Sequence, residues 1–508
     1  MADEERARMP ALIGDIIPYW AAKSPDRIVL VDDTGSWTYR ELDSAINATA
    51  SWLEQSGVRP GDRVMLVCEN CCAAVAVFLA LAVCGAWPVI VNARLSDREI
   101  DEVREHSGAR RIILTTGASA RARAHAERLG AVPHDPASFG PVALSPLNEA
   151  AIPEPVEADA TARVAALLYT SGTTGRPKGV MLSHSNLLFV ARASGQVRSL
   201  GPEDKTYAVM PISHILGLTG ILLGSLLCGA QLRLASRFDP AAVFAALDRD
   251  RATVLIGTPS MHAMLVEYAT RKRLIPISRP GLRILSSAGA PLDAATKAAT
   301  EAAFGLTLHN GYGITECSPT ITLTSLESPR SDCSVGRLLP GVEARLVGPD
   351  GSNAAPDDVG ELWVRGPGVM KGYYRAPAET AEAVNAEGWF RTGDLARIED
   401  GNVFIVGRCK ELIIRFGFNV YPAEIEGVLN AHPDVARSAV IGRQADGTED
   451  VLAFVHLAAG ARATTDDLSD YAATKLAPYK RPSRIVVVPS MPVSPTGKIL
   501  KSELAAMA

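Results

Sequence analysis

A short segment rich in glycine and hydroxyl groups, YTSGTTGRPKG, has the composition of a loop that holds phosphate. Its glycines allow positive φ angles, and successive backbone N–H groups in such a turn can bind an anion. The spacing differs from the common G-x-x-x-x-G-K-[S/T] loop. A plain hairpin between two strands is the simpler alternative, but four hydroxyls and a lysine exceed what a turn needs. The segment therefore predicts phosphate binding without identifying the nucleotide. The candidate contacts are Thr170, Ser171, Gly172, Thr173, Thr174, Gly175 and Lys178.

A second candidate segment reads HNGYGITECSP. Gly311 and Gly313 flank Tyr312, so a tight backbone presents an aromatic ring on which adenine could stack. Thr315 can donate a hydrogen bond to a phosphate. The carboxylate of Glu316 suits Mg²⁺, which prefers oxygen ligands. A turn at the end of a strand, capped by the Thr–Glu pair, would explain the same residues.

Two later stretches each carry a single charged residue beside a glycine. Asp394, in GWFRTGDLA, could bind the two hydroxyls of a ribose, as the acidic residue of dinucleotide sites does. An aspartate at a turn is more often a local cap. Lys498 lies in PTGKILK near the C-terminus, where a lysine is usually a solvated charge. Each of these motifs alone is weak evidence for a nucleotide site. The order in which they follow one another along the chain is stronger evidence.

In this order, the motifs are specific, and the chain resembles the adenylate-forming superfamily of acyl-CoA synthetases, peptide-synthetase adenylation domains and luciferases. The matching stretches are YTSGTTGRPKG, GYGITE, RTGD, GRCKE with GFNVYPAEIE, and PTGK. The resemblance extends from about Ile16 to Leu504, nearly the whole chain. The pattern is closest to the CoA ligases of fatty or aryl (4-coumarate-like) acids.

This resemblance implies an acid–thiol ligase that uses ATP, Mg²⁺ and coenzyme A. The acid would attack the α-phosphate, releasing pyrophosphate from the phosphate loop, and CoA would then displace AMP. Thr315 would contact the α-phosphate, Glu316 would bind Mg²⁺, and Lys498 would bridge the α-phosphate and the carboxylate. Asp394 would hold the ribose with Arg408 beside it. Further nucleotide contacts are implied for Gly289, Ala290, Pro291, Asn310, Gly311, Tyr312 and Gly313.

The resemblance also implies a rotation of a small C-terminal domain between the two steps. Lys410 lies at the hinge position, and the rotation would withdraw Lys498. It would bring in the loop around Gly417, where the missing side chain lets a pantetheine arm pass. Phe416 stands where relatives often carry a small residue, so it either crowds the thiol path or packs outward.

The acid pocket is expected to be neutral. His214, in PISHILGL, occupies the position that gates or lines the acyl site, and the absence of an aspartate nearby argues against an amino acid. The expected wall residues are Leu216, Gly220, Met261, Ala288, Gly311, Ile314 and Pro319. A hydrophobic acid is therefore favoured. Arg283 is the one nearby cation: it is either a structural arginine or, if it points inward, a residue for a dicarboxylate such as malonate. Delivery to a carrier protein instead of CoA also stays open.

Strand-like and helix-like runs must position these residues. RVMLVC, WPVIVN, RRIILT, VAALLYT, KTYAVM, TVLIGT and LRILSSA alternate with amphipathic segments, a pattern typical of α/β layers with largely parallel sheets. We expect a large N-terminal ATP- and acid-binding domain with a β-rich subdomain at residues 1–407, a hinge at 408–410, and a small mobile α+β domain at 411–508. Residues 133–159 look like a surface connection.

Composition limits the class of protein. The 508 residues carry 51 Lys plus Arg against 56 Asp plus Glu, and a net charge of −5 argues against a nucleic-acid partner. Eight cysteines, without a secretory signal, suggest free thiols in a reducing cytoplasm. The C-x-x-C in CENCC lacks the second pair that a zinc site needs.

The remaining expectations concern membranes and partners. Residues 73–91 are uncharged and near bilayer length, but Gly85 and Pro88 interrupt them, so a buried helix followed by a buried strand is expected instead of a membrane span. A small-molecule carboxylic acid is the main partner. Modification of Lys498 by a protein acetyltransferase and assembly into a homodimer are further hypotheses.

Overall fold

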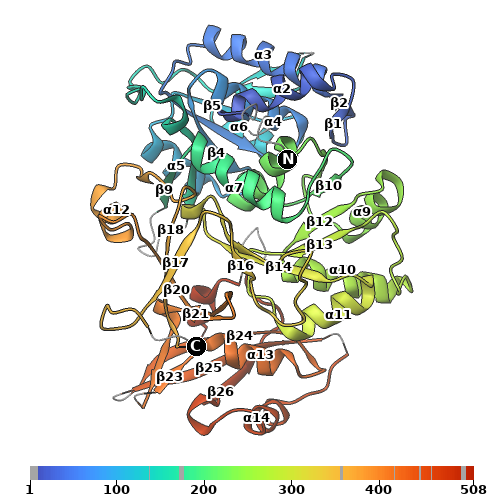
Figure 1. The fold of residues 1–508 in the computed structure, drawn as a ribbon, viewed down its shortest axis with the longest axis vertical. Coiled ribbons are helices and arrows are strands. Elements are labelled where there is room, and N and C mark those ends of the chain that lie inside the picture. The colour runs from blue at the N-terminus through green and yellow to red at the C-terminus, as the bar shows by residue number, and fades with distance from the viewer. Residues whose placement is uncertain are drawn as a thin grey trace.

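The computed structural model describes eight stretches of the chain. They are residues 10–136, 138–170, 177–354, 358–416, 418–445, 448–458, 460–493 and 499–507. Two large sheets with their helices occupy the upper and middle parts of the molecule in Figure 1, and the last strands and helices form its lower end.

An eight-stranded sheet has the order β19-β9-β8-β4-β3-β5-β7-β6, with a parallel centre and antiparallel edges. Its strands are β3 (Arg63–Cys68), β4 (Trp87–Asn92), β5 (Arg111–Leu114), β6 (Val132–His134), β7 (Val142–Leu144), β8 (Val164–Thr170), β9 (Lys178–Ser183) and β19 (Gly372–Tyr373). Val64 and Leu66 enter the central core, whereas Met65 and Val67 pack in a separate cluster with α5 (Asp97–Ser107) and α6 (Ala120–Arg128). Successive side chains of a strand point to opposite faces, so both faces of this sheet are covered.

A nine-stranded sheet has the order β16-β15-β14-β13-β12-β10-β11-β1-β2 and is parallel from β14 to β1. Its strands are β1 (Ile28–Val31), β2 (Ser36–Thr38), β10 (Lys205–Ala208), β11 (Gln231–Leu234), β12 (Val254–Gly257), β13 (Ile284–Ser287), β14 (Leu308–Gly313), β15 (Thr320–Leu323) and β16 (Arg337–Leu338). Ile256 and Ile284 enter the central core. Leu255 and Leu285 instead belong to a second cluster. That cluster includes side chains of α9 (Pro240–Ala245), α10 (Pro259–Lys272) and α11 (Ala294–Phe304).

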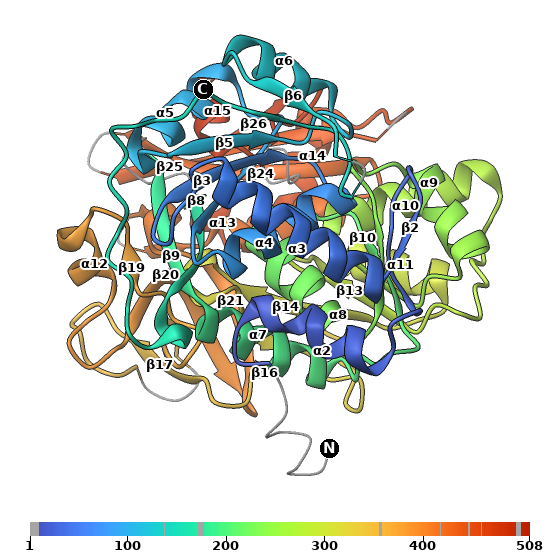
Figure 2. The same cartoon turned by 90° about the horizontal axis from the view of Figure 1, so that it is seen from above.

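Helices packed between the two sheets make the arrangement five-layered. They are α2 (Ile16–Lys23), α3 (Tyr39–Gln55), α4 (Cys72–Val83), α7 (His184–Val197), the helical segment Leu216–Leu223 and α8 (Gly224–Leu227). Seen from above, α3 and α4 cross the middle of the view in Figure 2. Helix α4 is almost wholly buried and apolar all round, as a helix inside a large core must be.

The later part of the chain forms two smaller units. The first is an antiparallel sheet of β17 (Glu343–Val347), β18 (Gly360–Arg365), β20 (Phe390–Glu399) and β21 (Asn402–Arg408), with α12 (Pro377–Ala383) beside it. The second contains the hairpin β22 (Ile413–Arg415) and β23 (Phe418–Val420), then α13 (Pro422–Asn430), β24 (Val435–Ala445), β25 (Thr448–Leu457), α14 (Thr465–Ala473), β26 (Arg484–Val487) and α15 (Lys501–Ala505). Buried clusters of this second unit's own residues form its cores. The predicted fold class is confirmed.

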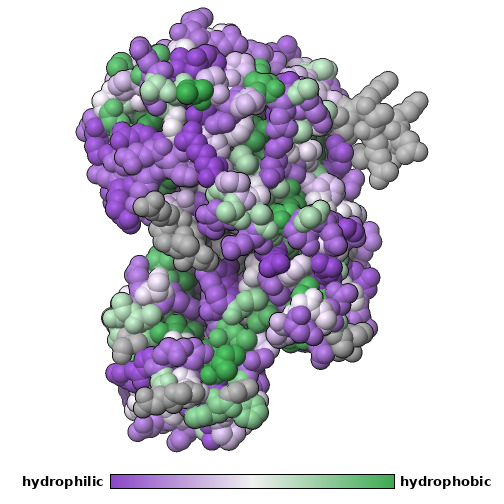
Figure 3. Space-filling view, turned by 90° about the vertical axis from the view of Figure 1, so that its left-hand side faces the viewer, coloured by the Kyte–Doolittle hydropathy of each residue, from purple (hydrophilic) through white to green (hydrophobic). Residues whose placement is uncertain are grey.

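The apolar stretch at residues 73–91 is a buried helix followed by a strand, as expected. Within the described stretches, no helix is long and apolar enough to cross a membrane. The face in Figure 3 is mostly hydrophilic, with hydrophobic atoms in smaller patches. The prediction that residues 133–159 are a surface connection is wrong in part. The antiparallel pair of β6 and β7 adds to the sheet edge there, and Phe139 and Val142 are buried.

The cysteines are free thiols in the structure. Burial raises the pKa values of Cys68 and Cys72, and it raises the pKa of Cys71 to about 12. These thiols therefore stay protonated near neutral pH. Among the described residues, no group of three or more His, Cys, Asp or Glu side chains is placed to hold a metal ion.

Candidate active site

Several of the candidate residues gather at one edge of the nine-stranded sheet. Ala288 and Gly289 follow the carboxyl end of β13, and Tyr312 lies at the carboxyl end of β14. Met261 lies in the first turn of α10, which begins directly after β12. In open α/β sheets, ligands bind outside the carboxyl ends of the strands. The edge therefore has the position of a binding site.

Gly289 connects the predicted nucleotide segment to the predicted acyl wall. Its φ of +83° is one that side chains rarely adopt, and a Cβ added to it would lie 3.9 Å from side-chain carbons of both Leu216 and Thr258. Gly289 and Pro291 are exposed, and Ala290 is half-buried, so a ligand can reach this segment. Their contact with a nucleotide stays a prediction.

Tyr312 and Asp394, predicted from separate motifs, lie in direct contact. The Tyr312 hydroxyl donates a hydrogen bond of 2.5 Å to Asp394 Oδ2, although 82 residues separate them in the chain. Arg408 lies opposite Asp394 in the pairing of β20 with β21, and its Nε lies 3.2 Å from Asp394 Oδ1. Asp394 lies within a strand and not at a turn, so the local-cap alternative is wrong. The Asp394 carboxylate is buried, with Tyr312 at one oxygen and Arg408 at the other.

Burial and the neighbouring carboxylate together raise the pKa of Tyr312 well above its usual value. The phenol therefore stays protonated at neutral pH and remains a hydrogen-bond donor to Asp394. The ring and the carboxylate hold each other in place before any ligand binds.

The backbone around Tyr312 requires glycine. A Cβ on Gly313 would lie 2.1 Å from the Pro319 carbonyl oxygen, and one on Gly311 would lie 2.8 Å from a Leu323 side-chain carbon. Asn310 has a clear structural role, since its side-chain amide donates to the carbonyls of Cys333 and Ser334. Its predicted nucleotide contact is a separate proposal that this geometry does not test.

Thr315 and Glu316 begin a 3₁₀ turn directly after β14. Glu316 Oε1 accepts a hydrogen bond of 2.9 Å from the Tyr373 hydroxyl, and its backbone carbonyl accepts one from Met370 N. A single carboxylate fits Mg²⁺, because that ion is usually held by one or two carboxylates together with substrate phosphates. Glu316 would hold it there, and the phosphates of ATP would complete the coordination.

The ends of the phosphate loop lie next to this group. Thr170 ends β8 and pairs with Lys178, which begins β9. The Lys178 ammonium nitrogen lies 5.0 Å from the centre of the Tyr373 ring. The strands that flank the predicted phosphate loop therefore do form a hairpin, as the simpler alternative proposed. A hairpin is compatible with phosphate binding by the residues between the strands. The candidates that lie outside the described residues are Ser171, Gly172, Thr173, Thr174, Gly175, Gly417 and Lys498.

Tyr373 is the residue that the sequence did not reveal. It lies in MKGYYRAP, far along the chain from both of its partners, and backbone contacts with distant segments, among them the pairing of β19 with β9, bring it to the site. No local pattern in the sequence predicts such a two-residue edge strand.

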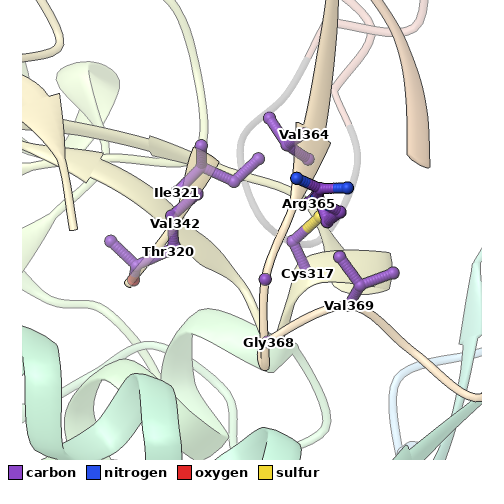
Figure 4. A pocket seen from close by; sticks show the side chains of 9 residues that line it. Cys317, Thr320, Ile321, Val342, Val364, Arg365, Gly368 and Val369 are labelled. Atoms are coloured by element: carbon purple, nitrogen blue, oxygen red, sulfur yellow. The ribbon is translucent and has the colours of Figure 1, made fainter. Parts of the chain in front are cut away.

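A shallow apolar depression lies beside the turn that carries Glu316. Cys317, Ile321, Val364 and Val369 contribute to its lining, and Figure 4 shows these side chains around it. It has room for about one water molecule, which is too little for a carboxylic acid. The expected acyl wall near Leu216 stays a prediction.

His214 lies at the start of the helical segment that provides much of that wall. Its Nδ1 accepts a hydrogen bond of 3.3 Å from Leu216 N, so the ring is held against the first turn. Leu216, Gly220 and Ala288 are buried, in keeping with an apolar surface.

Arg283 does not belong to the acid pocket. It precedes β13, at the amino end of the strand, whereas Ala288 lies at the carboxyl end. Its guanidinium makes two hydrogen bonds to Asp204, of 2.7 and 2.5 Å, and a third to the Ser199 carbonyl. The structural alternative for Arg283 is therefore correct, and its proposed role in holding a dicarboxylate is wrong.

The predicted hinge lies where β21 ends. Arg408 is the last residue of that strand, and Lys410 is exposed in the turn Cys409–Glu411 that follows. Phe416 is 67% exposed with a φ of +52°, so it packs outward in this conformation. The assignment of residues 408–410 as a hinge between two domains stays a prediction.

Comparison with known proteins gives a consistent result. The family model "AMP-binding enzyme" matches residues 17–374, and "AMP-binding enzyme C-terminal domain" matches residues 424–498. Feruloyl-CoA synthase from Amycolatopsis sp is 35% identical over 490 residues, which are 95% of this chain and 96% of that protein. The 4-coumarate–CoA ligase 3 of Oryza sativa subsp. japonica is 32% identical over 501 residues, covering 94% and 89%.

A solved structure agrees over the same length. ATP-bound MatB from Rhodopseudomonas palustris has a TM-score of 0.87 and 30% identity, and the match covers 98% of this chain and 99% of that one. The predicted resemblance and the predicted enzyme class, an AMP-forming acid–thiol ligase, are confirmed. The chain belongs to the AMP-binding enzymes, the adenylate-forming superfamily.

Proposed function

We propose that this protein is an ATP-dependent carboxylic acid–CoA ligase that activates a hydrophobic, preferably aryl, acid as its acyl-adenylate and transfers the acyl group to coenzyme A. The observation that carries the proposal is the contact of Tyr312, Asp394 and Arg408 at the carboxyl edge of the large sheet. Glu316 follows Tyr312 closely in the chain. An aromatic ring and a buried carboxylate suit a nucleoside, and a second carboxylate nearby suits the metal of its phosphates.

Each residue has a distinct task in this reaction. Tyr312 would stack on the adenine, and Asp394 would accept hydrogen bonds from the ribose hydroxyls. Lys178 would hold the departing pyrophosphate, and Glu316 would hold Mg²⁺. When bound, Mg²⁺ neutralises negative charge on the phosphates. Lys498 would place a positive charge between the α-phosphate and the attacking carboxylate, and such preorganised charge is usually among the largest catalytic contributions.

A hydrophobic acid is supported by the neutral wall and by the relatives. Leu216, Gly220 and Ala288 carry no charge, and Arg283 binds Asp204 at the opposite end of its strand. Two of the relatives act, by name, on feruloyl and 4-coumaroyl groups, which are aryl acids. A dicarboxylate lacks a cation among these described wall residues, so a monocarboxylic acid is the stronger proposal.

The test is pyrophosphate release by the purified protein with ATP, Mg²⁺ and a panel of acids, with and without CoA. The panel contains straight-chain acids of increasing length, benzoate, 4-coumarate, ferulate, malonate and succinate. Each buried methylene contributes about 0.8 kcal/mol, or roughly a fourfold rise in kcat/KM, until the pocket is full. Malonate or succinate as the best substrate would contradict the neutral pocket. Adenylate formation without an acyl-CoA product would favour a carrier protein as acceptor.

Asp394→Asn tests the nucleotide site directly. The amide keeps the size of the side chain but removes the charge that Tyr312 and Arg408 contact. Hydrogen bonds to charged groups contribute about 1.5–3 kcal/mol, so kcat/KM for ATP should fall by roughly 10–100-fold. The KM for the acid should change little, and an unchanged dependence on ATP would contradict the assignment.

Location and partners belong to the same proposal. A cytoplasmic enzyme is supported by the free state of its cysteines. Acetylation of Lys498 by a protein acetyltransferase would remove its charge and should stop adenylate formation. Assembly into a homodimer is a further hypothesis, and sedimentation of the purified protein decides it.

A further inference from the structure

Tyr373 contacts two groups of opposite charge that come from different segments of the site. Its hydroxyl donates to Glu316 Oε1 at 2.9 Å. The face of its ring lies 5.0 Å from the ammonium nitrogen of Lys178. One side chain thus joins the predicted metal ligand to the predicted phosphate-loop lysine.

The segment that carries Tyr373 is fixed on both sides. Met370 N donates to the Glu316 carbonyl at 2.8 Å, and Tyr374 N donates to the Gly179 carbonyl at 2.7 Å. Between them, β19 pairs with β9, with Tyr373 opposite Val180. The ring is therefore held by the same backbone that supports its two partners.

The Tyr373 hydroxyl is in the correct state to act as a donor. Tyr373 is buried, and its hydroxyl lies within hydrogen-bond distance of a carboxylate oxygen, which can only accept. Its bond occupies Oε1 and leaves Oε2 of Glu316 for another partner. Hydrogen bonds of this kind orient the carboxylates that bind metals, and their loss typically costs about 10–100-fold in metal affinity or activity.

We propose that Tyr373 is a positioning residue that couples metal binding to phosphate binding in the adenylation site. Its hydroxyl fixes the orientation of the Glu316 carboxylate, and its ring holds the Lys178 ammonium by a cation–π contact. The ring contacts both charged groups, the carboxylate through its hydroxyl and the ammonium over its face. This inference rests on the proposed function of the site.

The test is calorimetric titration of the whole protein with ATP, without acid or CoA, at a series of Mg²⁺ concentrations. Tyr373→Phe keeps the ring but loses the hydroxyl. It should need about tenfold more Mg²⁺ for half-maximal enhancement of ATP binding, with metal-free ATP binding unchanged. Tyr373→Leu loses both contacts, and it should also weaken metal-free ATP binding by about fivefold, because the cation–π contact to Lys178 is absent.

Tyr374→Phe is the matched control. It removes a hydroxyl from the next residue of the same segment, whose hydrogen bond of 2.5 Å goes to Glu154. Tyr374 packs in the cluster with Met65 and Val67, whereas Tyr373 belongs to the central core, so the Mg²⁺ dependence of Tyr374→Phe should equal that of the wild type. Thermal unfolding of all three variants confirms that they are folded.

Two results would overturn the inference while leaving the proposed function intact. The first is a Mg²⁺ dependence of Tyr373→Phe equal to that of the wild type. The second is an equal shift in Tyr374→Phe, which would indicate a general softening of the segment. A wild-type protein whose ATP binding ignores Mg²⁺ would instead refute the proposed function itself, together with the inference.

Discussion

Arg283 shows that the partner of a charged residue decides its role. The guanidinium donates hydrogen bonds to both oxygens of Asp204, and the Thr253 hydroxyl donates to the same carboxylate. Burial by itself would raise the pKa of Asp204. The bonds from Arg283, Gly201 and Thr253 outweigh burial and lower it. The pair therefore stabilises the folded protein at neutral pH.

Arg283→Ala should lower the free energy of unfolding by about 2 kcal/mol at pH 7, because a buried carboxylate loses a charged hydrogen-bond partner. Since the folded pKa of Asp204 is depressed, this stabilisation is present above the carboxyl's unfolded pKa of about 3.9 and is lost as pH falls through the folded pKa. The effect of the substitution should shrink below about pH 4. Urea unfolding at pH 7 and pH 3.5 measures it.

The control for this prediction is Arg40→Ala, which removes a pair with Asp26 whose side chains are 62% and 82% exposed. An exposed pair contributes only about 0–1 kcal/mol, so this variant should be close to the wild type. A change in the preferred acid of Arg283→Ala, without loss of stability, would restore the dicarboxylate role.

At the residue level, the sequence predicted those site residues that lie within a recognisable motif. Tyr312 and Asp394 belong to two separate motifs, each of which predicts a nucleotide contact, and the structure joins them by a hydrogen bond. Tyr373 and the partner of Arg283 could not be predicted. Each depends on a contact between distant segments, which local spacing does not encode.

At the level of elements, buried parallel strands were the most predictable feature. RVMLVC, WPVIVN and VAALLYT coincide with β3, β4 and β8, because short runs of apolar and β-branched residues bounded by polar ones leave few alternatives. The short strands β6 and β7 were missed, because three residues are too few to show a strand pattern and β6 also contains a proline. The pairing of β7 with β5 and of β6 with β7 depends on contacts with the rest of the sheet and not on the sequence of the two strands alone.

The last helix is joined to the segment after the predicted hinge by a half-buried lysine. Lys501 Nζ lies 2.9 Å from both Glu411 Oε2 and Glu426 Oε1. Burial alone would lower its pKa, but Glu426 and Glu411 outweigh this and raise it, so Lys501 is charged at neutral pH. An isolated antiparallel β-bridge pairs Val493 with Ile499, shortly before Lys501. These contacts hold the start of α15 next to Glu411, one residue beyond Lys410.

Lys501→Met should therefore disturb the positioning of the segment that contains Lys498. We expect adenylate formation to slow about tenfold, since loss of a charged hydrogen bond costs about 1.5–3 kcal/mol. Conversion of supplied acyl-AMP to acyl-CoA should change less than twofold. Lys501→Arg should restore most of the first step, because it keeps the charge between the two glutamates. Single-turnover kinetics of the two half-reactions measure the difference.

Lys480→Met is the control for this prediction. Lys480 pairs with Glu424, on the same helix as Glu426, at 2.7 Å. A similar loss of adenylation in Lys480→Met would mean that the domain is merely destabilised. Equal loss of both half-reactions in Lys501→Met would show that Lys501 does not act on the first step alone.

For the whole molecule, the order of the motifs was more informative than any single motif. It predicted an AMP-binding enzyme along nearly the full chain, and the family models cover residues 17–374 and 424–498. The identity of the acid could not be predicted from the sequence, because the expected wall residues are neutral and the shape of a pocket depends on packing between distant segments. The sequence predicts a motion about residues 408–410, and only kinetics can test it.

Lys498 and the hinge should serve different halves of the reaction. The charge of Lys498 would be needed while the carboxylate attacks the α-phosphate, and removing such a group commonly costs about 10²–10³ in rate. Lys498→Ala should therefore lose adenylate formation but still convert supplied acyl-AMP and CoA to thioester. Lys410 is exposed in the turn after β21, where proline would fix φ and stiffen the chain. Lys410→Pro should release pyrophosphate yet form little thioester.

Lys410→Ala separates stiffness from the loss of the lysine itself, since alanine leaves φ free; it should retain both half-reactions. The measurement is paired pre-steady-state kinetics: pyrophosphate release with ATP and acid, and acyl-CoA formation from synthetic acyl-AMP. Rotation of the small domain between the steps requires opposite defects in Lys498→Ala and Lys410→Pro. If each variant loses both steps to the same extent, the two steps share one arrangement of the domains, and the alternation that the sequence predicts does not occur in this protein.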